Sequence, residues 1–450
     1  MNGINQDAKK ITDLIVEVDG KQFIKRHLSD LHPADIADII ETLDEEKKKE
    51  VFNLLKTETA SDVILEVNDQ SREQILEDIN KEKLTDIVEE MASDEAADLI
   101  ADLSKEEARD VLEKLHWKDS AEVQKLLKYP EDTAGGIMQT ELLSIREEML
   151  VEDAIIEYMA ISQDVGNIHN AFIIDKDRKL VGVIPVRNLL IIKAETPISK
   201  VMVRNVISVN AHVDQEEVAK IFKKYDFVSL PVVDDEGKLV GVIVIDDIID
   251  VLIEEASEDM LHLAGVYQDE KVTDHPLKSV RMRLPWLIIN LATATLAASV
   301  VGLFQDTLQA MVILAIFMPI VAGMGGNAGT QALTVTVRGI ALGELSFSNA
   351  KRAVLNGITI GILNGVITGI IMALIAYYWK GNYMLGIVLG LAMIINLFVA
   401  NFFGIIIPIT LKWLKIDPAV ASSIFLTALT DCIGFFSFLG LATLFIKYLI

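Results

Sequence analysis

The sequence predicts a multidomain membrane protein with an all-α superhelical N-terminal domain, a tandem pair of small α/β domains and an all-α five-helix transmembrane domain. Three observations predict this: a 12-residue period in 32–127, a strand–strand–helix pattern that occurs twice in 138–253, and five long uncharged runs from Leu284 onward. The expected parts are the acidic N domain at 1–131, the α/β pair at 132–252, an acidic connecting helix at 246–276 and the membrane domain at 277–450.

The charge distribution separates the two halves of the chain. From Leu284 onward there are four acidic and seven basic side chains, whereas the part of the chain before Leu284 holds 62 acidic and 34 basic ones. Such an acidic half argues against nucleic acid as a partner, because phosphates need Lys and Arg for neutralisation, and it suits metal cations. The polar start of the chain predicts no cleavable signal peptide. The single cysteine, Cys432, and seven scattered His argue against a disulfide, a zinc site or an enzyme.

The N domain carries the 12-residue repeat. Polar residues recur at that spacing, and each is followed directly by an apolar residue: Ile39, Val51, Val63, Ile75, Ile87, Leu99, Val111 and Val123. One repeat has room for a single short helix and a turn, which cannot bury an apolar face alone. Stacked neighbours can, and this predicts a helical superhelix in which most of the acids lie on a solvated outer face.

The α/β pair is predicted from two similar segments that follow one another in the chain. Ala171–Asp175 and Leu180–Ile184 recur as Leu230–Asp234 and Leu239–Ile243, each pair followed by a helix from Arg187 or Asp246. This pattern resembles a tandem pair of CBS domains. Such modules often bind adenine nucleotides through a Ser or Thr before the helix and an Asp just inside it. Here Val244 replaces the hydroxyl residue although Asp247 is present, so ATP is a candidate ligand without assigned residues.

The connecting helix is the most acidic segment. From Leu239 to Glu270 there are nine acids and no Lys or Arg. Asp247, Asp250, Glu254 and Glu258 share one face, and each like-charge pair costs about 0.2–0.5 kcal/mol. A charge run is usually a solvated face. Because divalent cations prefer oxygen ligands and would replace this repulsion with attraction, we favour a helix that senses divalent cations.

The membrane domain is predicted from five uncharged runs, 284–305, 307–337, 353–379, 381–411 and 418–446, the last interrupted only by Asp431. An odd number of spans puts the termini on opposite sides of the membrane. Basic residues gather at the ends that are cytoplasmic when the N-terminus is inside. We therefore expect a multi-pass protein of the cell (inner) membrane with a cytoplasmic N-terminus and an external C-terminus.

Two spans carry polar groups that suggest a pore. A carboxylate at the centre of a span costs roughly 2.5–3.5 kcal/mol, so Asp431 indicates a cation site, a proton relay or a structural hydrogen bond. The second span contains Pro319 and a glycine-rich segment, which predicts a helix broken at membrane depth. Close helix packing by small residues is the alternative.

The order of these parts, with Pro319–Gln331 (PIVAGMGGNAGTQ) and Asp417–Gly434 (DPAVASSIFLTALTDCIG), closely resembles the MgtE family of magnesium channels. The resemblance covers essentially the whole chain. It implies a homodimer with a pore for hydrated Mg²⁺ at the subunit interface. It also implies that intracellular Mg²⁺ bridges the N domain, the CBS pair and the connecting ("plug") helix and closes the pore.

The resemblance also implies site residues. Pore metal binding falls on Asp431 and the Thr427 carbonyl, with Asp417 at an additional site, and the pore lining falls on Gly325, Gly326 and Asn327. Sensor positions are Asp94, Asp98, Gly136 through its backbone, Asp214, Glu216, Asp226, Asp247, Asp250, Glu255, Glu258 and Asp259.

Three alternatives stay open at this stage. The chain could carry Mn²⁺, Co²⁺ or Ca²⁺ instead of Mg²⁺, or exchange a cation for protons through Asp431. It could also be a membrane-bound metal sensor that moves no ion.

Overall fold

The computed structural model describes residues 26–77, 79–162, 168–267, 270–272, 274–346, 348–419 and 422–449. It divides into two compact units, Met1–Ile253 and Glu254–Ile450, which are described separately below.

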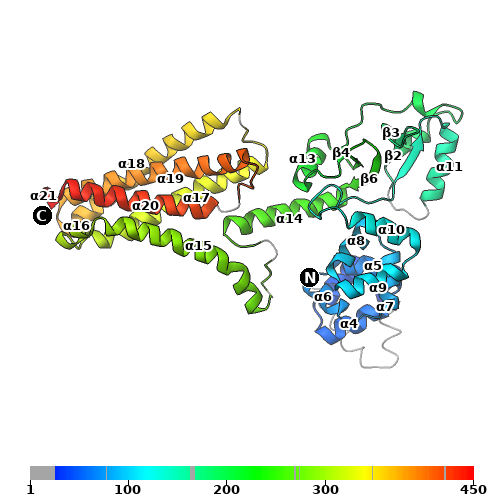
Figure 1. The fold of residues 1–450 in the computed structure, drawn as a ribbon, viewed down its shortest axis with the longest axis horizontal. Coiled ribbons are helices and arrows are strands. Elements are labelled where there is room, and N and C mark those ends of the chain that lie inside the picture. Colours follow the sequence, from blue (N-terminus) through cyan, green and yellow to red (C-terminus); the bar gives the residue numbers. More distant parts are fainter. Residues whose placement is uncertain are drawn as a thin grey trace. The chain divides into compact units, whose positions relative to one another are not determined.

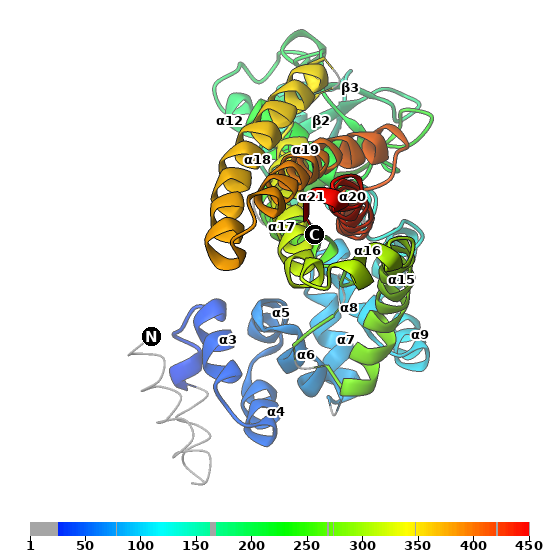
Figure 2. The ribbon, with the colours of Figure 1, turned by 90° about the vertical axis from the view of Figure 1, so that its left-hand side faces the viewer.

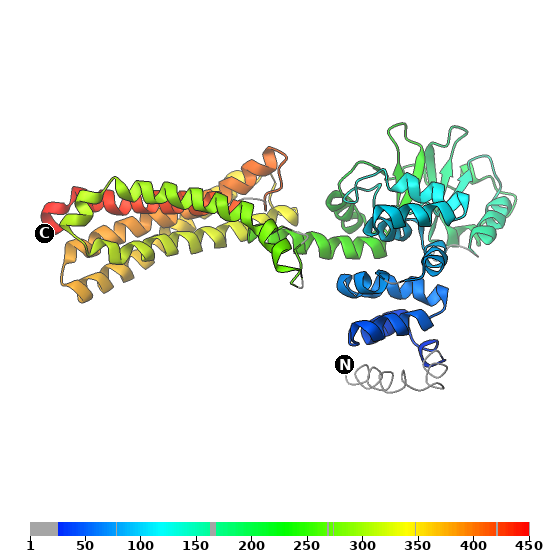
Figure 3. The same ribbon diagram turned by 60° about the horizontal axis from the view of Figure 1, so that its bottom comes forward.

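From Pro33 to Leu126 the described residues form eight short helices, and their first residues follow one another at the spacing of the predicted repeat. They are α3 (Pro33–Glu41), α4 (Glu45–Leu54), α5 (Thr57–Glu66), α6 (Asp69–Leu76), α7 (Lys81–Glu89), α8 (Ser93–Asp102), α9 (Lys105–Lys114) and α10 (Trp117–Leu126). Helices two apart in sequence pack together, as in α3 on α5 and α8 on α10, and the stack is visible in Figure 3. The predicted superhelix is confirmed.

The repeat predicted the core of this stack. The apolar residue of every repeat is buried, from Ile39 to Val123. The residue before a helix often caps it, as Asp44 does when its side chain accepts a hydrogen bond from the Lys47 N–H at 3.1 Å. The buried repeat residues form one core with the second half of the α/β pair.

The α/β pair consists of two copies of the same three-stranded arrangement. The first copy contains β1 (Leu143–Arg146), α11 (Val151–Ile161), β2 (Asn170–Ile174), β3 (Leu180–Pro185) and α12 (Val186–Leu189); the second contains β4 (Val209–Asn210), α13 (Gln215–Tyr225), β5 (Ser229–Val233), β6 (Leu239–Val244) and α14 (Ile245–Leu263). In each sheet the first strand pairs in parallel with the second, and the second pairs antiparallel with the third. A short 3₁₀ turn, η1 (Ile198–Lys200), lies between the copies. The strand prediction is confirmed, and both following helices begin one residue earlier than predicted.

The acidic connecting helix is shorter than the expected segment 246–276. α14 ends at Leu263, and Gly265 follows with φ +73°, a left-handed conformation that glycine adopts without strain. The next helix begins at Pro276.

In the described part of the second unit, five long helices and two short ones follow the end of α14 (Figure 1). The long helices are α15 (Pro276–Gly302), α17 (Leu314–Ala341), α18 (Ala350–Lys380), α19 (Tyr383–Trp413) and α20 (Ser422–Leu444), and the short ones are α16 (Gln305–Ala310) and α21 (Ile446–Leu449). α19 packs against α17, α18 and α20, as the view along the bundle in Figure 2 shows. By length and composition, α15, α18, α19 and α20 are able to cross a membrane. α17 is as long but is not among these four helices; it carries glycines, Asn327 and Gln331.

α17 is continuous, so the predicted break in the second span is wrong. Pro319 lies near the start of α17, where its missing N–H removes a hydrogen bond close to the helix end rather than at the centre, and the helix continues through the glycines. A Cβ on Gly325 would lie 2.9 Å from the Asn396 Cγ, and one on Gly329 would lie 3.0 Å from the Leu426 Cδ2. The glycines therefore allow α19 and α20 to approach α17 closely, which is the packing alternative.

α18 and α19 use glycine in the same way. Gly357, Gly361, Gly365 and Gly369 recur at every fourth position along the face of α18 that contacts α19. A Cβ on Gly369 would lie 2.8 Å from the Gly390 carbonyl oxygen, so the two backbones nearly touch. Small residues at this spacing are a common basis for helix association in membranes.

Candidate ion-binding sites

Asp431 lines a cavity of about 370 Å³ in the C-terminal unit. It lies on α20, and its side chain is partly buried. The other lining residues are Ala264, Gly265, Asn290, Thr293, Ala294, Ser423, Ile424, Thr427 and Ala428. The only carboxylate among them is therefore surrounded by hydroxyl, amide and small side chains, which suits a small hydrated cation better than an apolar ligand.

Thr427 lies one turn before Asp431 and lines the same cavity, as predicted from their spacing. Its hydroxyl donates to the Ser423 carbonyl at 2.8 Å, and its own carbonyl accepts from the Thr430 hydroxyl at 3.0 Å. Because Thr427 lies within α20, its carbonyl is also the acceptor for the Asp431 N–H in the helix, so both of its lone pairs are used within the chain. The Thr427 hydroxyl oxygen still has lone pairs that can accept from a hydrated ion.

Asn290 and Thr293 of α15 were not predicted to belong to this site. They are three positions apart, so they share one face of a helix that packs on α20. The signal in the sequence was their spacing in an otherwise apolar span. Because that spacing is also found in ordinary helix contacts, it identifies the residues only when α15 is placed beside α20.

The predicted pore-lining segment of α17 has a different environment. Gly325 is buried against Asn396, whose side-chain N–H donates to the Val321 carbonyl at 2.8 Å. Gly326 is partly exposed and Asn327 is exposed on the same helix. Within this single chain none of the three lines the Asp431 cavity.

Asp417 has a partner that the sequence analysis did not single out. Its Oδ2 lies 3.1 Å from Nδ1 of His262 near the end of α14, and the same nitrogen lies 3.5 Å from Oε1 of Glu258. The other Asp417 oxygen accepts from the Ala419 N–H at 2.9 Å. The contact joins the end of the connecting helix to the segment before α20.

In the N-terminal unit the charge of Asp247 acts on Asp94, although the two residues are far apart in the sequence. Asp94 lies in the first turn of α8, its side chain is only 6% exposed, and its Oδ1 has no hydrogen-bond partner among the described residues. Asp247 lies in the first turn of α14. Glu95 and Glu141 also face this position, and Glu141 accepts from the Ser93 hydroxyl at 2.7 Å.

The electrostatics of this acidic cluster favour a cation. Burial raises the pKa of Asp94 well above its ordinary range, and the nearby charge of Asp247 adds to the effect. Burial, followed by the charge of Asp246, raises the pKa of Asp247 to about 7. Burial also raises the pKa of Glu95. Among the described residues no cationic side chain is a cause of these shifts, so bound protons or metal ions are what can relieve the repulsion.

The remaining sensor positions are not all gathered at this cluster. Asp250 contributes to the field at Asp247, whereas Asp98 is exposed on α8. Asp214 caps α13 by accepting from the Glu216 N–H at 2.9 Å, and Glu216 pairs with Lys220.

Two further sensor positions have special backbone geometry. Asp226 ends α13 in a left-handed conformation, with φ 53°. Gly136 packs tightly on its own turn, because a Cβ there would lie 2.5 Å from the Pro130 carbonyl oxygen.

Glu255, Glu258 and Asp259 lie on the part of α14 that belongs to the C-terminal unit. Within the described residues, no group of three or more His, Cys, Asp or Glu side chains is arranged to hold a metal ion.

Family models match most of the chain. Residues 318–441 match a family of divalent cation transporters, residues 31–132 match the MgtE intracellular N domain, and residues 134–195 and 198–254 match CBS domains. The resemblance to CBS domains is thereby confirmed.

Curated relatives agree with these models. The magnesium transporter MgtE of Bacillus subtilis is 36% identical over 331 residues, which is 74% of this chain and 73% of that protein. MgtE of Enterococcus faecalis is 36% identical over 74% of this chain and 73% of that protein. Inosine-5'-monophosphate dehydrogenases, such as that of Aquifex aeolicus at 40% identity, match only in part, over 17% of this chain in that case. The expectation that the chain is not an enzyme is confirmed.

A solved structure described as the soluble part of a magnesium transporter is also similar. It has a TM-score of 0.50 at 28% identity and covers 55% of this chain and 98% of that chain. Together with the helices that are able to span a membrane, these matches support Mg²⁺ transport by a multi-pass membrane protein. The chain belongs to the MgtE family of magnesium transporters.

Proposed function

We propose that this chain forms a homodimeric Mg²⁺ channel in which Asp431 of each subunit holds a hydrated ion. The observation that carries the proposal is the cavity of about 370 Å³ that joins Asp431 to Asn290, Thr293 and Thr427. Mg²⁺ gives up its water reluctantly, so one or two carboxylates with retained water are its usual ligands. A two-fold axis would supply the second carboxylate.

Uptake through such a pore needs no chemical energy source. A divalent ion moving inward gains about 4.6 kcal/mol per 100 mV of membrane potential, at about 2.3 kcal/mol per charge. Closure of the pore by internal Mg²⁺, proposed below, requires the acidic N-terminal half to be cytoplasmic, and five spans then put the C-terminus outside. Arg338 in the last turn of α17 and Lys351 and Arg352 in the first turn of α18 support that orientation, because they place positive charge at the connection between these two helices.

We further propose that cytoplasmic Mg²⁺ closes the pore by binding between α8 and α14. The charge of Asp247 acts on Asp94, and no cationic side chain among the described residues is a cause of either pKa shift, so an ion that bridges the two carboxylates replaces repulsion with attraction. α14 leads from this cluster to His262, which contacts Asp417 before α20. Binding at one end of α14 is thereby coupled to the helix that carries Asp431.

Flux into liposomes tests the transport proposal. Purified wild-type protein should admit Mg²⁺ at clamped voltage without a pH gradient, and Asp431→Asn should abolish the flux. Asp306→Asn is the matched control, because Asp306 lies on α16 and does not line the cavity. Flux that requires a pH gradient would favour a cation/proton exchanger, and larger flux of Mn²⁺ or Co²⁺ would change the substrate.

The same experiment separates a channel from a sensor that moves no ion. A sensor would show no flux of any divalent ion in either orientation of the protein. Normal Mg²⁺ flux through Asp431→Asn would overturn the pore assignment.

ATP on the CBS pair stays a prediction. Val244 ends β6, and its N–H lies 3.5 Å from the Asp247 side-chain oxygen, so Asp247 caps α14 and the hydroxyl residue typical of these modules is missing. Titration of the purified chain with ATP, with Asp247→Asn as the variant, tests this ligand.

A further inference from the structure

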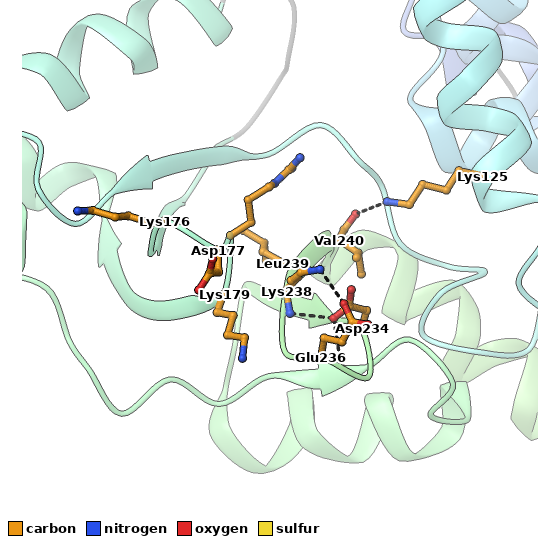
Figure 4. Close-up of a pocket in the computed structure, with 10 residues that line it drawn as sticks. Lys125, Lys176, Asp177, Lys179, Asp234, Glu236, Lys238, Leu239 and Val240 are labelled. Atoms are coloured by element: carbon orange, nitrogen blue, oxygen red, sulfur yellow. Dashed lines mark hydrogen bonds and ion pairs between the residues drawn. The ribbon is translucent and has the colours of Figure 1, made fainter.

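The turns of the two β-hairpins, β2–β3 and β5–β6, lie side by side in the N-terminal unit. The Leu180 N–H donates to the Gly237 carbonyl at 3.2 Å, and the Leu239 N–H donates to the Arg178 carbonyl at 3.1 Å. Lys125 of α10 reaches across to the Val240 carbonyl at 3.5 Å (Figure 4). These three elements border an open pocket of about 870 Å³, which is within the size range of sites for small molecules.

The pocket is positively charged in a chain whose net charge is −25. Its ionisable lining residues are Lys125, Lys176, Arg178, Lys179, Lys238, Asp177, Asp234 and Glu236. Lys238 pairs with Glu236 at 2.6 Å, and Lys176 pairs with Glu148 outside the pocket at 3.6 Å. Among the described residues, Arg178 and Lys179 have no carboxylate within ion-pair distance.

Lys125 experiences this excess of positive charge. Burial lowers its pKa first and the charge of Arg178 lowers it further, whereas the charges of Glu122 and Asp234 act in the opposite direction and do not cancel the shift. Elsewhere in this unit it is acidic side chains that repel one another, as at Asp94 and Asp247. Here two cations repel each other, and an anion bound between them would remove the repulsion.

The backbone of Arg178 supports a role for its side chain. Arg178 has φ 63°, and Gly237, at the same point of the second hairpin, has φ 78°. Glycine adopts this left-handed conformation freely, whereas a residue with a Cβ pays roughly 1–2 kcal/mol. At this position the first hairpin has an arginine, whereas the second hairpin has glycine, the residue that a left-handed turn favours. Strain kept at one point of a fold is a reason to look for function there.

We propose that this pocket binds a polyphosphate group, held by Arg178, Lys125 and Lys179. Phosphate oxygens accept charge-assisted hydrogen bonds from guanidinium and ammonium groups, and several adjacent phosphates match several adjacent cations. The ligand comes from inorganic polyphosphate or from a nucleotide that carries the same group. By joining α10 to both hairpins, it would stabilise the contact between the helical stack and the α/β pair.

This pocket is separate from the position at which CBS modules hold nucleotides. Leu239 and Val240 line it at the start of β6, whereas Val244 ends the same strand and Asp247 follows it. The extended chain from the start to the end of β6 spans about 16 Å at about 3.3 Å per residue, so one small ligand does not occupy both places.

Binding of inorganic triphosphate to the full-length protein in detergent, measured by calorimetry in Mg²⁺-free buffer, tests the proposal. Arg178→Gly should weaken binding at least tenfold, because charged hydrogen bonds are worth roughly 1.5–3 kcal/mol. The variant should fold, since glycine suits this backbone. Lys125→Ala should weaken binding as well, and the wild-type affinity should fall as salt is raised. Arg146→Ala, an exposed arginine at the end of β1, should bind as the wild type does.

ATP added to the triphosphate complex identifies the source of the group. Displacement of triphosphate by ATP in the wild type would show that a nucleotide supplies it. Failure of ATP to displace it would leave inorganic polyphosphate as the ligand. The proposal is overturned if triphosphate does not bind, or if Arg178→Gly and Arg146→Ala have equal affinity.

Discussion

The raised pKa of Asp247 makes a quantitative prediction about the N-terminal unit. We expect Asp247→Asn to stabilise this unit in Mg²⁺-free solution above pH 7. The folded-state pKa is about 7, compared with 3.8 for a free Asp, so the folded state holds the proton more tightly than the unfolded state. The contribution of Asp247 to wild-type stability is therefore most favourable below about pH 4, falls as the pH rises, and reaches its minimum above about pH 7.

The size of the effect follows from the same shift. The change in pKa from 3.8 to about 7 corresponds to about 4 kcal/mol at about 1.4 kcal/mol per pKa unit, which is an upper limit because Asp247 is partly exposed to solvent. Asn removes the charge but keeps a side-chain oxygen near the Val244 N–H. Wild-type protein should also gain stability from Mg²⁺ at this pH, because an ion between Asp94 and Asp247 relieves the repulsion, and the variant should gain much less.

Hydrogen exchange of the full-length protein measures both effects locally. The opening free energies of the amides in α8 and at the start of α14 should be compared at about pH 5 and about pH 8, with and without Mg²⁺. Glu152→Gln is the matched control, since Glu152 is an exposed acid in the first turn of α11 in the first copy. Equal opening free energies for wild type and Asp247→Asn at the higher pH, with equal responses to Mg²⁺, would refute the reasoning.

Three further predictions concern transport and packing. Asp431→Asn should abolish Mg²⁺ flux into liposomes, and undiminished flux would exclude Asp431 from the pore. A variant in which four acids of α14 are neutralised together should keep conducting at millimolar internal Mg²⁺ in patch recordings; these acids are Asp247, Asp250, Glu255 and Asp259. Closure of this variant as in the wild type would contradict the gating proposal. Gly325→Ala should destabilise the detergent-solubilised protein by roughly 1–3 kcal/mol in thermal unfolding, because its Cβ would press on Asn396. Gly323→Ala, with no atom within 4 Å of its Cβ, should not destabilise the protein, because Ala has the higher helix propensity. A loss for Gly325→Ala no larger than the change for Gly323→Ala would show that packing on Asn396 does not decide the result.

The repeats were readable from the sequence because they depend on local periodicity. Helices α3 to α10 begin at the spacing of the repeat, as the positions of buried residues such as Val51 and Ile87 indicated. The strands of the two α/β copies were placed because one pattern of apolar residues and turns occurs twice in the chain. Each of these signals lies within a short stretch of sequence and needs no knowledge of distant contacts.

The prediction for α17 failed because a glycine-rich segment has two physical explanations. Glycine weakens an isolated helix, but it also permits close approach of neighbouring helices. Which effect dominates depends on whether a partner such as Asn396 is present, and that residue lies on α19, far from Gly325 in the sequence. His262 was not predicted as the partner of Asp417 either, because the two residues are far apart in the sequence and meet only in the folded chain.

The sequence by itself determined the order of the parts, the apolar spans and the central carboxylate Asp431, because composition and period are properties of the chain. Only the tertiary structure decided which polar groups surround that carboxylate, that the charge of Asp247 acts on Asp94, and that the charge of Arg178 acts on Lys125. Cation sites and anion sites depend on charges brought together from distant segments. Their strength varies with distance and burial, and neither quantity is written in the spacing of residues along the chain.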